Sequence, residues 1–260
     1  MKLNSSQKSE VIKIIRQSHD KAALCELLDS LNNFIVHCSY SDDYIVTVTE
    51  DLYEMYVVLF TDEEAVVNIV SSSVKQYLSK YKIYNVYLNH IAYDAFSNTF
   101  IASNFKSKLT CFDVLTTRPI RYDVSEPEVP EIESIRDILG NCLKEYDIQE
   151  DNPMSGIIFE RVSKNLVNQA YRVLTCKDIV VSQLFLVEDD KDVFIKAVLT
   201  PYKNRGNGYA EKLLQQVINS YYGTDSVLHL SVSQYNGVAQ RLYSRLGFVK
   251  TNNLYMYTLI

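Results

Sequence analysis

Residues 204–217, NRGNGYAEKLLQQV, constrain the fold of this chain more than any other stretch. The chain has only 7 glycines among 260 residues, yet Gly206 and Gly208 stand one residue apart. An apolar pattern at helical spacing follows them, formed by Tyr209, Leu213, Val217 and Tyr221. The stretch therefore predicts a loop entering a helix, in which the backbone itself is needed at the two glycines.

Exposed backbone N–H groups at the start of a helix bind phosphate or pyrophosphate well. The stretch is not a Walker loop, because no G-K-[ST] follows. It is not a dinucleotide fingerprint either, because Glu211 stands where the third glycine of G-x-G-x-x-G is required. The alternative is a tight turn in which glycine eases the chain into the helix.

Length and composition indicate a globular chain of two ordinary domains, with 47% hydrophobic and 22% charged residues. A net charge of −6 argues against general nucleic-acid binding, which needs clustered Lys and Arg. No signal-peptide pattern opens the sequence, and no run approaches the roughly 20 apolar residues of a membrane span. The cysteines are odd in number, widely spaced and without a CxxC pair, which predicts reduced thiols, no metal site and a cytoplasmic location. They are Cys25, Cys38, Cys111, Cys142 and Cys176.

Three prolines, Pro119, Pro127 and Pro130, fall in an acidic stretch and predict a linker at 119–130. The linker separates a domain at 1–118 from a domain at 131–260. The second domain reads as helix, three strands, helix, strand, helix, strand, which predicts an α/β fold with a mixed sheet. The expected elements are a helix at 131–146, strands at 167–175, 179–188 and 192–200, a helix from 208, a strand at 226–233, a helix at 238–246 and a strand at 254–260.

A second motif, N-x-x-A-x-x-x-Y-x-x-x-G-F, lies at residues 236–248. It is formed by Asn236, Ala239, Tyr243, Gly247 and Phe248. Together with Arg205-x-x-Gly208-x-Ala210, which matches the pattern R/Q-x-x-G-x-G/A, it resembles the GNAT N-acetyltransferase superfamily. The resemblance is specific over residues 193–260, and it implies the GNAT fold with acetyl-CoA as co-substrate.

The resemblance also implies roles for individual residues. The backbone of Val198 and Leu199 would hold the pantetheine arm of CoA. The pyrophosphate would bind the backbone amides of Arg205, Gly206, Asn207, Gly208, Tyr209 and Ala210. Tyr243 would protonate the leaving thiolate, because a phenol with a reference pKa near 10 keeps its proton at neutral pH. Asn236 would bind the pantetheine or shape the helix start; the alternatives are a simple N-cap for Asn236 and a core position for Tyr243.

The general base is left open by the sequence. The attacking amine must lose a proton, and Glu160, Glu188 and Asp192 are the candidate carboxylates. Proton transfer through ordered water fits equally. His229 is interpreted as a strand residue, because no partner at metal-ligand spacing accompanies it.

Residues 1–118 repeat the order of elements of the second domain. Strands are expected at 44–51, 52–60, 83–89 and 108–115, helices at 62–80 and 94–103, and two amphipathic helical segments within 8–31. This order predicts a degenerate GNAT-like copy in tandem; the alternative is an unrelated α/β domain. Aligning Phe105 with Phe248 places Phe100 at the position of Tyr243, and Tyr93 at that of Asn236.

The N-terminal copy is expected not to bind CoA. Residues 60–67, FTDEEAVV, contain no glycine, and Thr61 and Glu64 fit a capping box that would occupy the amides at the helix start. The carboxylates of Asp62, Glu63 and Glu64 would repel a pyrophosphate.

These observations predict an acetyl-CoA-dependent N-acetyltransferase with one active copy, in the C-terminal half. The acetyl group would pass directly to a primary amine of a small molecule or peptide, with no nucleic-acid or membrane partner. The second hypothesis is a non-catalytic module with a GNAT fold that binds CoA or a protein partner. The sequence specifies neither the acceptor, the acyl-chain preference nor the oligomeric state.

Overall fold

The protein is represented by a computed structural model that describes residues 3–17, 27–28, 31, 36–49, 54–97, 106–145, 147–149 and 153–260. The chain divides into two compact units. Unit 1 comprises Met1–Leu115, Ser231–Gly237 and Lys250–Ile260, and unit 2 comprises Thr116–Leu230 and Val238–Val249. The predicted domains, 1–118 and 131–260, follow the repeat of elements along the sequence, whereas the two units follow contacts in space. These predicted domain bounds therefore stay a prediction. No helix of the described residues is long and apolar enough to cross a membrane.

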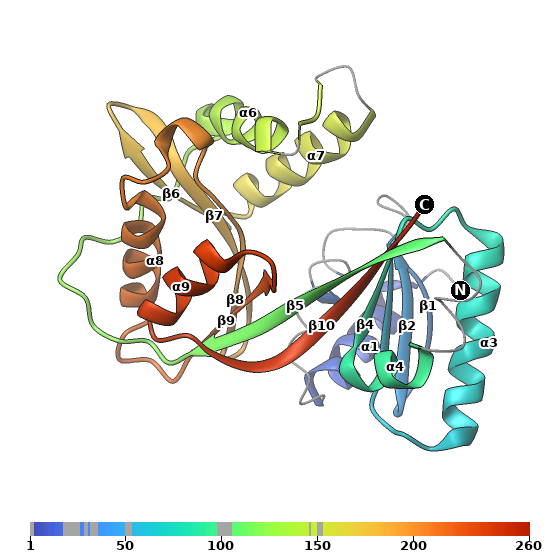
Figure 1. Cartoon of the computed structure of the whole chain (residues 1–260). Helices are drawn as coiled ribbons and strands as arrows, with labels where there is room; N and C mark the ends of the chain where they lie inside the picture. The colour runs from blue at the N-terminus through green and yellow to red at the C-terminus, as the bar shows by residue number, and fades with distance from the viewer. Residues whose placement is uncertain are drawn as a thin grey trace. The chain divides into compact units, whose positions relative to one another are not determined.

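Unit 1 has a mixed sheet with the strand order β1-β2-β3-β4-β10-β5. Strands β1, β2 and β3 are antiparallel, β4 is parallel to β3, and α3 connects these last two (Figure 1). The elements are α1 Ser5–Gln17, β1 Val36–Ser41, β2 Tyr44–Thr49, β3 Glu54–Leu59, α3 Glu64–Lys80, β4 Asn85–Asn89, α4 His90–Phe96, β5 Ser107–Thr117 and β10 Val249–Leu259.

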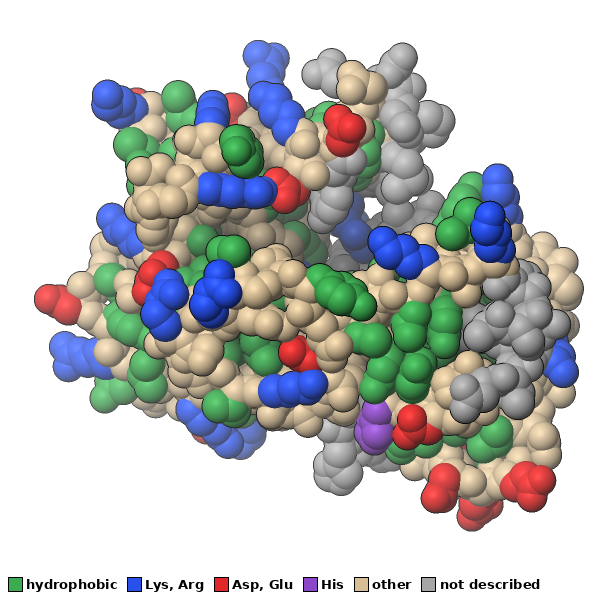
Figure 2. Space-filling model, in the orientation of Figure 1, with side chains coloured by type: hydrophobic (Ala, Val, Ile, Leu, Met, Phe, Trp, Pro, Cys, Tyr) green, Lys and Arg blue, Asp and Glu red, His purple; other side chains and the backbone are tan. Residues whose placement is uncertain are grey.

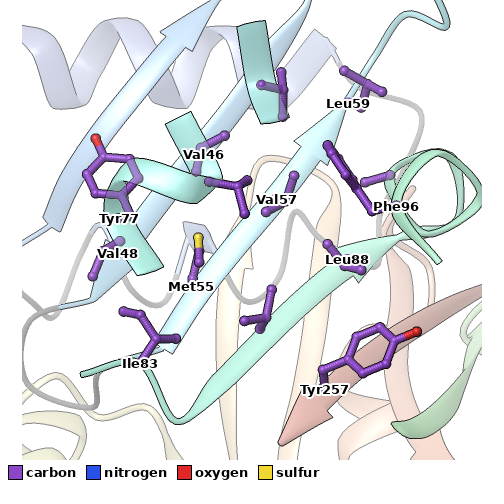
Figure 3. Packing of buried hydrophobic residues seen from close by; sticks show 14 residues of the cluster. Val46, Val48, Met55, Val57, Leu59, Tyr77, Ile83, Leu88, Phe96 and Tyr257 are labelled. Atoms are coloured by element: carbon purple, nitrogen blue, oxygen red, sulfur yellow. The ribbon is translucent and has the colours of Figure 1, made fainter. Parts of the chain in front are cut away.

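The core of unit 1 forms where the apolar face of α3 covers the sheet. Val70, Val74 and Tyr77 recur at helical spacing and are buried. They belong to the buried cluster drawn in Figure 3, in which Val57 of β3 and Phe96 of α4 are almost fully enclosed. Each such side chain stabilises the unit by about 1.5–3 kcal/mol relative to an exposed position.

Strand β10 comes from the far end of the chain and is part of the sheet of unit 1. It runs antiparallel to β4, with Leu254 opposite Asn89 and Tyr257 opposite Val86. Leu254 and Tyr257 are buried. Tyr255 stacks on Tyr93 of α4 with ring centroids 3.8 Å apart. The sheet of unit 1 is therefore completed by the last strand of the C-terminal half.

Unit 2 has the strand order β9-β8-β7-β6, with antiparallel pairs β6/β7 and β7/β8 and a parallel pair β8/β9. Helices α6 and α7 pack together, and Ile138, Val162 and Leu166 form a buried cluster with side chains of the sheet. The elements are η1 Ile132–Ser134, α6 Ile135–Glu145, α7 Pro153–Val167, β6 Tyr171–Cys176, β7 Ile179–Asp189, β8 Asp192–Leu199, η2 Tyr202–Asn204, α8 Tyr209–Ser220, β9 Val227–Ser233 and α9 Gly237–Arg245.

The predicted order of elements is confirmed, with two additions. Strand β1 and helix α7 are absent from the sequence prediction. The signal for α7 is present in the sequence, since Pro153 stands at the first helical position and Val162 and Leu166, four residues apart, are both buried. Most of the second predicted amphipathic segment within 8–31 lies outside the described residues.

The tandem arrangement is confirmed by the repetition of seven elements. The series β1-β2-β3-α3-β4-α4-β5 recurs as β6-β7-β8-α8-β9-α9-β10. Corresponding strand pairs also have the same orientation, antiparallel for the first two pairs and parallel for the third. The first half is therefore a degenerate GNAT-like copy, and the alternative of an unrelated α/β domain is wrong.

The structure corrects the alignment between the two copies by one helical turn. Helix α4 begins at His90, earlier than the predicted residue 94, so Asn89 stands directly before it, as Asn236 stands before α9. Phe96 then takes the position of Tyr243, and Tyr93 is not the counterpart of Asn236. The repeated pattern is N-x-x-A-x-x-x-F, formed by Asn89, Ala92 and Phe96. Phe100 and Phe105, on which the predicted alignment rested, lie outside the described residues.

Candidate active site

The candidate site begins where β8 loses its regular pairing. The register between β7 and β8 shifts between Gln183 and Phe185, so that Leu184 faces both Ala197 and Val198 in a β-bulge. Ala197 has φ +50°, a left-handed conformation that costs free energy for any residue with a Cβ. Sequence reasoning missed Ala197, because no residue type in the stretch signals a bulge.

Strand β8 also parts from its other neighbour before the bulge. Its parallel pairing with β9 covers Asp192 to Phe194, and the second half of β8 continues without a register partner on β9. On the side of β8 that faces β9, the backbone groups of Val198 therefore take no part in strand pairing. Leu199 is different, because its side chain is buried in the cluster with Ile138 and its carbonyl accepts a hydrogen bond from the Ser182 hydroxyl at 3.3 Å. Of the two residues predicted to face pantetheine, Val198 is the half-buried one beside the opening.

The glycine loop leads directly from β8 to the start of α8. Gly206 and Gly208 have φ +80° and +75°, which explains why glycine occupies both positions. Gly208 is the N-cap of α8 and no side chain caps the helix. The first helical hydrogen bond runs from the Lys212 amide to the Gly208 carbonyl at 3.0 Å. The amides of Tyr209 and Ala210 precede it and have no partner within the helix, an arrangement that suits an anion.

Side chains around the loop hold its shape. Arg205 donates from Nε to the Thr200 carbonyl at 3.0 Å and forms an ion pair with Glu145 at 2.5 Å. Asn207 donates from Nδ2 to the carbonyls of Asn204 at 3.1 Å and Arg205 at 3.3 Å. The side chains of both residues are thus used inside the protein, which leaves the backbone amides of the loop to face a ligand. Glu145 was not singled out from the sequence, and it lies at the end of α6, about 60 positions from its partner.

Tyr243 lies on α9, which ends in a Schellman motif. The Phe248 amide donates to the Tyr243 carbonyl at 3.0 Å, and the Gly247 amide donates to the Ser244 carbonyl at 3.1 Å. Gly247 has φ +86°, as this cap requires. The predicted helix end at Gly247 is confirmed, and the aromatic ring of Phe248 meets the Tyr243 ring edge-on at 6.0 Å.

The Tyr243 phenol is 6% exposed, and this burial raises its pKa to about 12. A phenol with such a pKa is fully protonated at neutral pH, which is the state that a proton donor needs. A core residue would be buried in the same way. The position of Tyr243 is therefore compatible with both predicted roles, the proton donor and the core residue.

Raising the pH should therefore destabilise the protein through Tyr243. The folded state holds the phenolic proton more tightly than the unfolded chain, so this contribution is complete below pH 10 and is lost as the pH rises through 12. We expect the free energy of unfolding to fall by about 2–3 kcal/mol more in the wild type than in Tyr243→Phe over this window. Urea denaturation of both proteins at intervals from pH 9 to 12 measures the difference. If the free energy of unfolding falls with pH at the same slope in both proteins, the phenol ionises as freely in the folded protein as in water.

Asn236 stands directly before the first residue of α9 and is exposed. Its amide donates to the Ser233 carbonyl at 2.9 Å, which places it in the turn that joins β9 to the helix. This is the position of an N-cap, and it is also beside the end of β9. Both predicted roles of Asn236 therefore remain compatible with its position.

The candidate carboxylates on the hairpin already have partners. Glu188 accepts a hydrogen bond from the Tyr221 hydroxyl, and Asp192 is 2.7 Å from His229 Nε2. Tyr221 follows the last residue of α8, so Glu188 lies about 18 Å along this helix from Gly208. These hydrogen bonds stabilise the hairpin end of the sheet. The third candidate, Glu160, lies on an exposed face of α7. These contacts do not affect the alternative route, in which the amine proton leaves through ordered water.

His229 is a strand residue, as predicted, but it has more partners than the sequence suggests. Besides Asp192 it bonds through Nδ1 to the Thr116 hydroxyl at 3.0 Å, and its ring stacks on Phe194 with centroids 5.0 Å apart. The side chain is buried. These contacts join β8 and β9 at the last residue pair before the two strands part.

The helix start in the N-terminal copy differs from the prediction. Helix α3 begins at Glu64 with Glu63 as its N-cap, and no side chain caps it, so the capping box of Thr61 and Glu64 is wrong. The Thr61 hydroxyl instead accepts a hydrogen bond from the Glu63 amide at 3.2 Å. The reason is that Thr61 stands two residues before the N-cap, where its hydroxyl reaches only the turn.

Comparisons with known proteins concern the fold and the segment that contains the candidate site. A profile of the FR47-like protein family matches residues 186–257, which include β8, the glycine loop, α8, β9 and α9. No curated protein matches the chain.

Solved structures resemble the whole chain at low sequence identity. A GNAT-family acetyltransferase from Colwellia psychrerythraea is 11% identical with a TM-score of 0.63, covering 100% of this chain and 99% of its own. A tandem GNAT protein from the clavulanic acid biosynthesis pathway is 10% identical with a TM-score of 0.63, covering 99% and 97%. A GCN5-related N-acetyltransferase from Sphaerobacter thermophilus is 15% identical with a TM-score of 0.56, covering 83% and 79%. The chain thus has the fold of the GNAT superfamily in a tandem arrangement, with an FR47-like segment in its C-terminal half.

Proposed function

We propose that the C-terminal half is an acetyl-CoA-dependent N-acetyltransferase that transfers the acetyl group directly to a primary amine. The observation that carries this proposal is the parting of β8 from β9 after Phe194, followed by the bulge and by an uncapped helix start with two positive-φ glycines. An extended strand edge followed by free helix-start amides suits a ligand with a hydrogen-bonding arm and a pyrophosphate.

The residues of the site divide the binding between them. The amides of the loop from Gly206 to Ala210 would hold the pyrophosphate, and the open edge of Val198 would hold the amide groups of the pantetheine arm. Gly206 and Gly208 bring the backbone close because they have no Cβ, and an added Cβ at either position would meet open space. Glycine is therefore required at these positions for backbone conformation and ligand approach, rather than for packing within the protein.

Tyr243 would supply the proton that the reaction needs. The amine nitrogen bonds to the carbonyl carbon of the thioester, the carbon–sulfur bond breaks, and sulfur leaves with the bonding pair as a thiolate. Tyr243 donates its phenolic proton to this sulfur, and the proton lost by the amine passes through water, from which the phenolate recovers its own. The phenol on α9 stays protonated across the whole neutral range, since burial raises the pKa of Tyr243 to about 12.

The second candidate is a non-catalytic CoA-binding or partner-binding module. The hydrogen bonds that occupy Glu188 and Asp192 favour it, because they leave only Glu160, on an exposed face of α7, among the three candidate bases. The two candidates differ in turnover but not in CoA binding. A cytoplasmic location and a small-molecule or peptide amine as acceptor complete the proposal, and both rest on the sequence alone.

Replacing Gly208 by aspartate should weaken CoA binding by about tenfold or more, because like charges brought together at an interface cost several kcal/mol. Isothermal titration calorimetry with CoA measures the change. Gly223→Asp is the matched control, since Gly223 also has a positive φ, of +84°, with open space around an added Cβ, but follows the opposite end of α8. An equal loss of affinity in both variants, or in neither, would remove the loop from the binding site.

A further inference from the structure

Unit 1 contains a pocket of about 670 Å³ at the start of helices α3 and α4. Most of its lining is apolar, and two carboxylates and an imidazole complete it. The lining residues are Leu59, Phe60, Asp62, Val67, His90, Ile91, Asp94 and Ala95. A volume of this size is ordinary for a site that takes a small organic ligand.

The pocket has the same place in the first copy that the glycine loop has in the second. Leu59 ends β3 as Leu199 ends β8, and Asp62 lies in the connection to α3 as Gly206 lies in the connection to α8. The far wall comes from α4, the counterpart of α9. The connection is shorter in the first copy, with residues 60–63 in place of residues 200–208, and it has no glycine.

Asn89 fixes the walls of this pocket relative to each other. Its Oδ1 accepts from the Ala92 amide at 2.9 Å and caps α4, while its Nδ2 donates to the Leu59 carbonyl at 3.1 Å. The side chain is 1% exposed, so both hydrogen bonds are protected from water. Helix α4 is held from its other side by the stacking of Tyr93 on Tyr255. The pocket is therefore built by buried contacts and is formed before any ligand arrives.

The charge of the pocket is opposite to that expected for a CoA site. Asp62 and Asp94 stand at its edge, and neither forms an ion pair with a lysine or arginine among the described residues. Glu63 and Glu64 follow at the start of α3, where Figure 2 shows acidic side chains gathered. The Thr61 hydroxyl also occupies the Glu63 amide. A pyrophosphate would meet carboxylates where the second copy offers free amides.

We propose that this pocket binds an organic cation, an ammonium group carried on an apolar or aromatic body. The ammonium would lie between the carboxylates of Asp62 and Asp94, and the apolar body would lie against Val67, Ile91 and Ala95. The first copy would thus bind its ligand at the position where the second copy would bind CoA, but it would prefer a cation to an anion. This inference is independent of the acetyltransferase activity proposed for the second copy, because it rests on the pocket of unit 1.

Methyl NMR on the full chain tests this proposal, because Val67, Ile91 and Ala95 line the pocket and are partly exposed. Phenethylammonium is the probe, and 2-phenylethanol and 3-phenylpropionate are its uncharged and anionic counterparts. We expect phenethylammonium to shift the three sets of methyl signals saturably, with a dissociation constant below about 10 mM for so small a ligand. The two counterparts should bind more weakly, and CoA should leave these signals unchanged.

Two variants assign the charge preference to named residues. Asp62→Asn and Asp94→Asn should each weaken phenethylammonium binding by about 1.5-fold to fivefold, the range for an exposed ion pair. Both residues are exposed, so the fold should persist, and unchanged signals of buried methyls in unit 2 such as those of Leu213 check this. Asp42→Asn, in the exposed turn between β1 and β2, is the matched control and should bind like the wild type.

Four outcomes would overturn the proposal: no saturable shift with phenethylammonium, equal binding of 3-phenylpropionate or 2-phenylethanol, unchanged affinity in both asparagine variants, or CoA shifting the pocket methyls. The CoA experiment is separate from the proposed activity, since binding at the glycine loop of unit 2 would leave the methyl signals of Val67, Ile91 and Ala95 unaffected. Loss of turnover in the second copy would likewise leave this result standing.

Discussion

Deleting residues 250–260 is expected to unfold unit 1, although the deletion lies more than 150 positions away in sequence from β4. The deletion removes the strand that pairs with β4 along five residues, from Asn85 to Asn89. It also removes the buried side chains of Leu254 and Tyr257 and the ring of Tyr255 that stacks on α4. Three such side chains contribute roughly 5 kcal/mol or more, which is comparable with the whole stability of a domain.

Amide hydrogen exchange of the peptide that contains β4 measures this effect, since its protection should fall to that of an unfolded chain. Adding a synthetic peptide of residues 250–260 should restore part of the protection, because the open edge of β4 can pair with it. A point variant gives a graded comparison. Leu254→Ala should cost about 2–5 kcal/mol. Val249→Ala, at a 63% exposed position of the same strand, should cost no more than about 0.5 kcal/mol. Full protection of β4 in the truncated chain would contradict the assignment of β10 to unit 1.

Replacing Tyr243 by phenylalanine should slow acetyl transfer by about 10²–10⁴-fold, the usual contribution of a general acid. The fold should persist, because phenylalanine keeps the ring that packs edge-on against Phe248. CoA affinity should also persist, since the loop that would hold the pyrophosphate lies at the start of a different helix, α8. The effect should therefore appear in kcat at unchanged CoA dissociation constant.

The measurement is single-turnover acetylation of a verified amine substrate, so that product release does not mask the chemical step. Tyr221→Phe is the matched control, because it also removes a hydroxyl from a tyrosine whose pKa is raised by burial and by its bond to Glu188. Tyr221 follows the end of α8 opposite to the loop, so its variant should retain normal turnover. If Tyr243→Phe reacts as fast as the wild type, the tyrosine is a core residue and another group protonates the thiolate.

The C-terminal half could be predicted because its determinants are local. The positive φ angles of Gly206, Gly208 and Gly247 are conformations that few other residues adopt, so the sequence has to carry glycine there. The apolar periodicity of α8 and the helix cap before Phe248 are local as well. These features predict the loop, helices α8 and α9 and the strands beside them, and the structure confirms these elements.

The N-terminal half could be predicted only in outline, because the corresponding glycines are missing. Without them the alignment was anchored on an aromatic residue outside the described residues. The pattern of Asn89, Ala92 and Phe96 was in the sequence and marks the true correspondence with Asn236, Ala239 and Tyr243. Asn89 has a structural use in the first copy, because it caps α4 and donates a hydrogen bond to the Leu59 carbonyl.

Two features of the candidate site lie beyond what sequence reasoning can supply. The bulge at Ala197 depends on a register shift between two strands, and alanine gives no hint of a positive φ. The ion pair of Arg205 with Glu145 joins residues of two elements that meet only in the folded unit. Both depend on long-range packing rather than on the local chain.

The pairing of β4 with β10 also sets an order of events during synthesis. Asn89 and Leu254, which stand opposite each other, are 165 positions apart, so a ribosome adding roughly 5–20 residues per second completes the pair some ten to thirty seconds after β4 emerges. Throughout this interval β4 has one edge without its native partner, and exposed strand edges are where nascent chains aggregate. The first strands of unit 1 are thus synthesised before unit 2 but gain their last pairing partner after it. The yield of unit 1 in a cell should therefore depend on chaperones that protect an open strand edge until β10 has been synthesised.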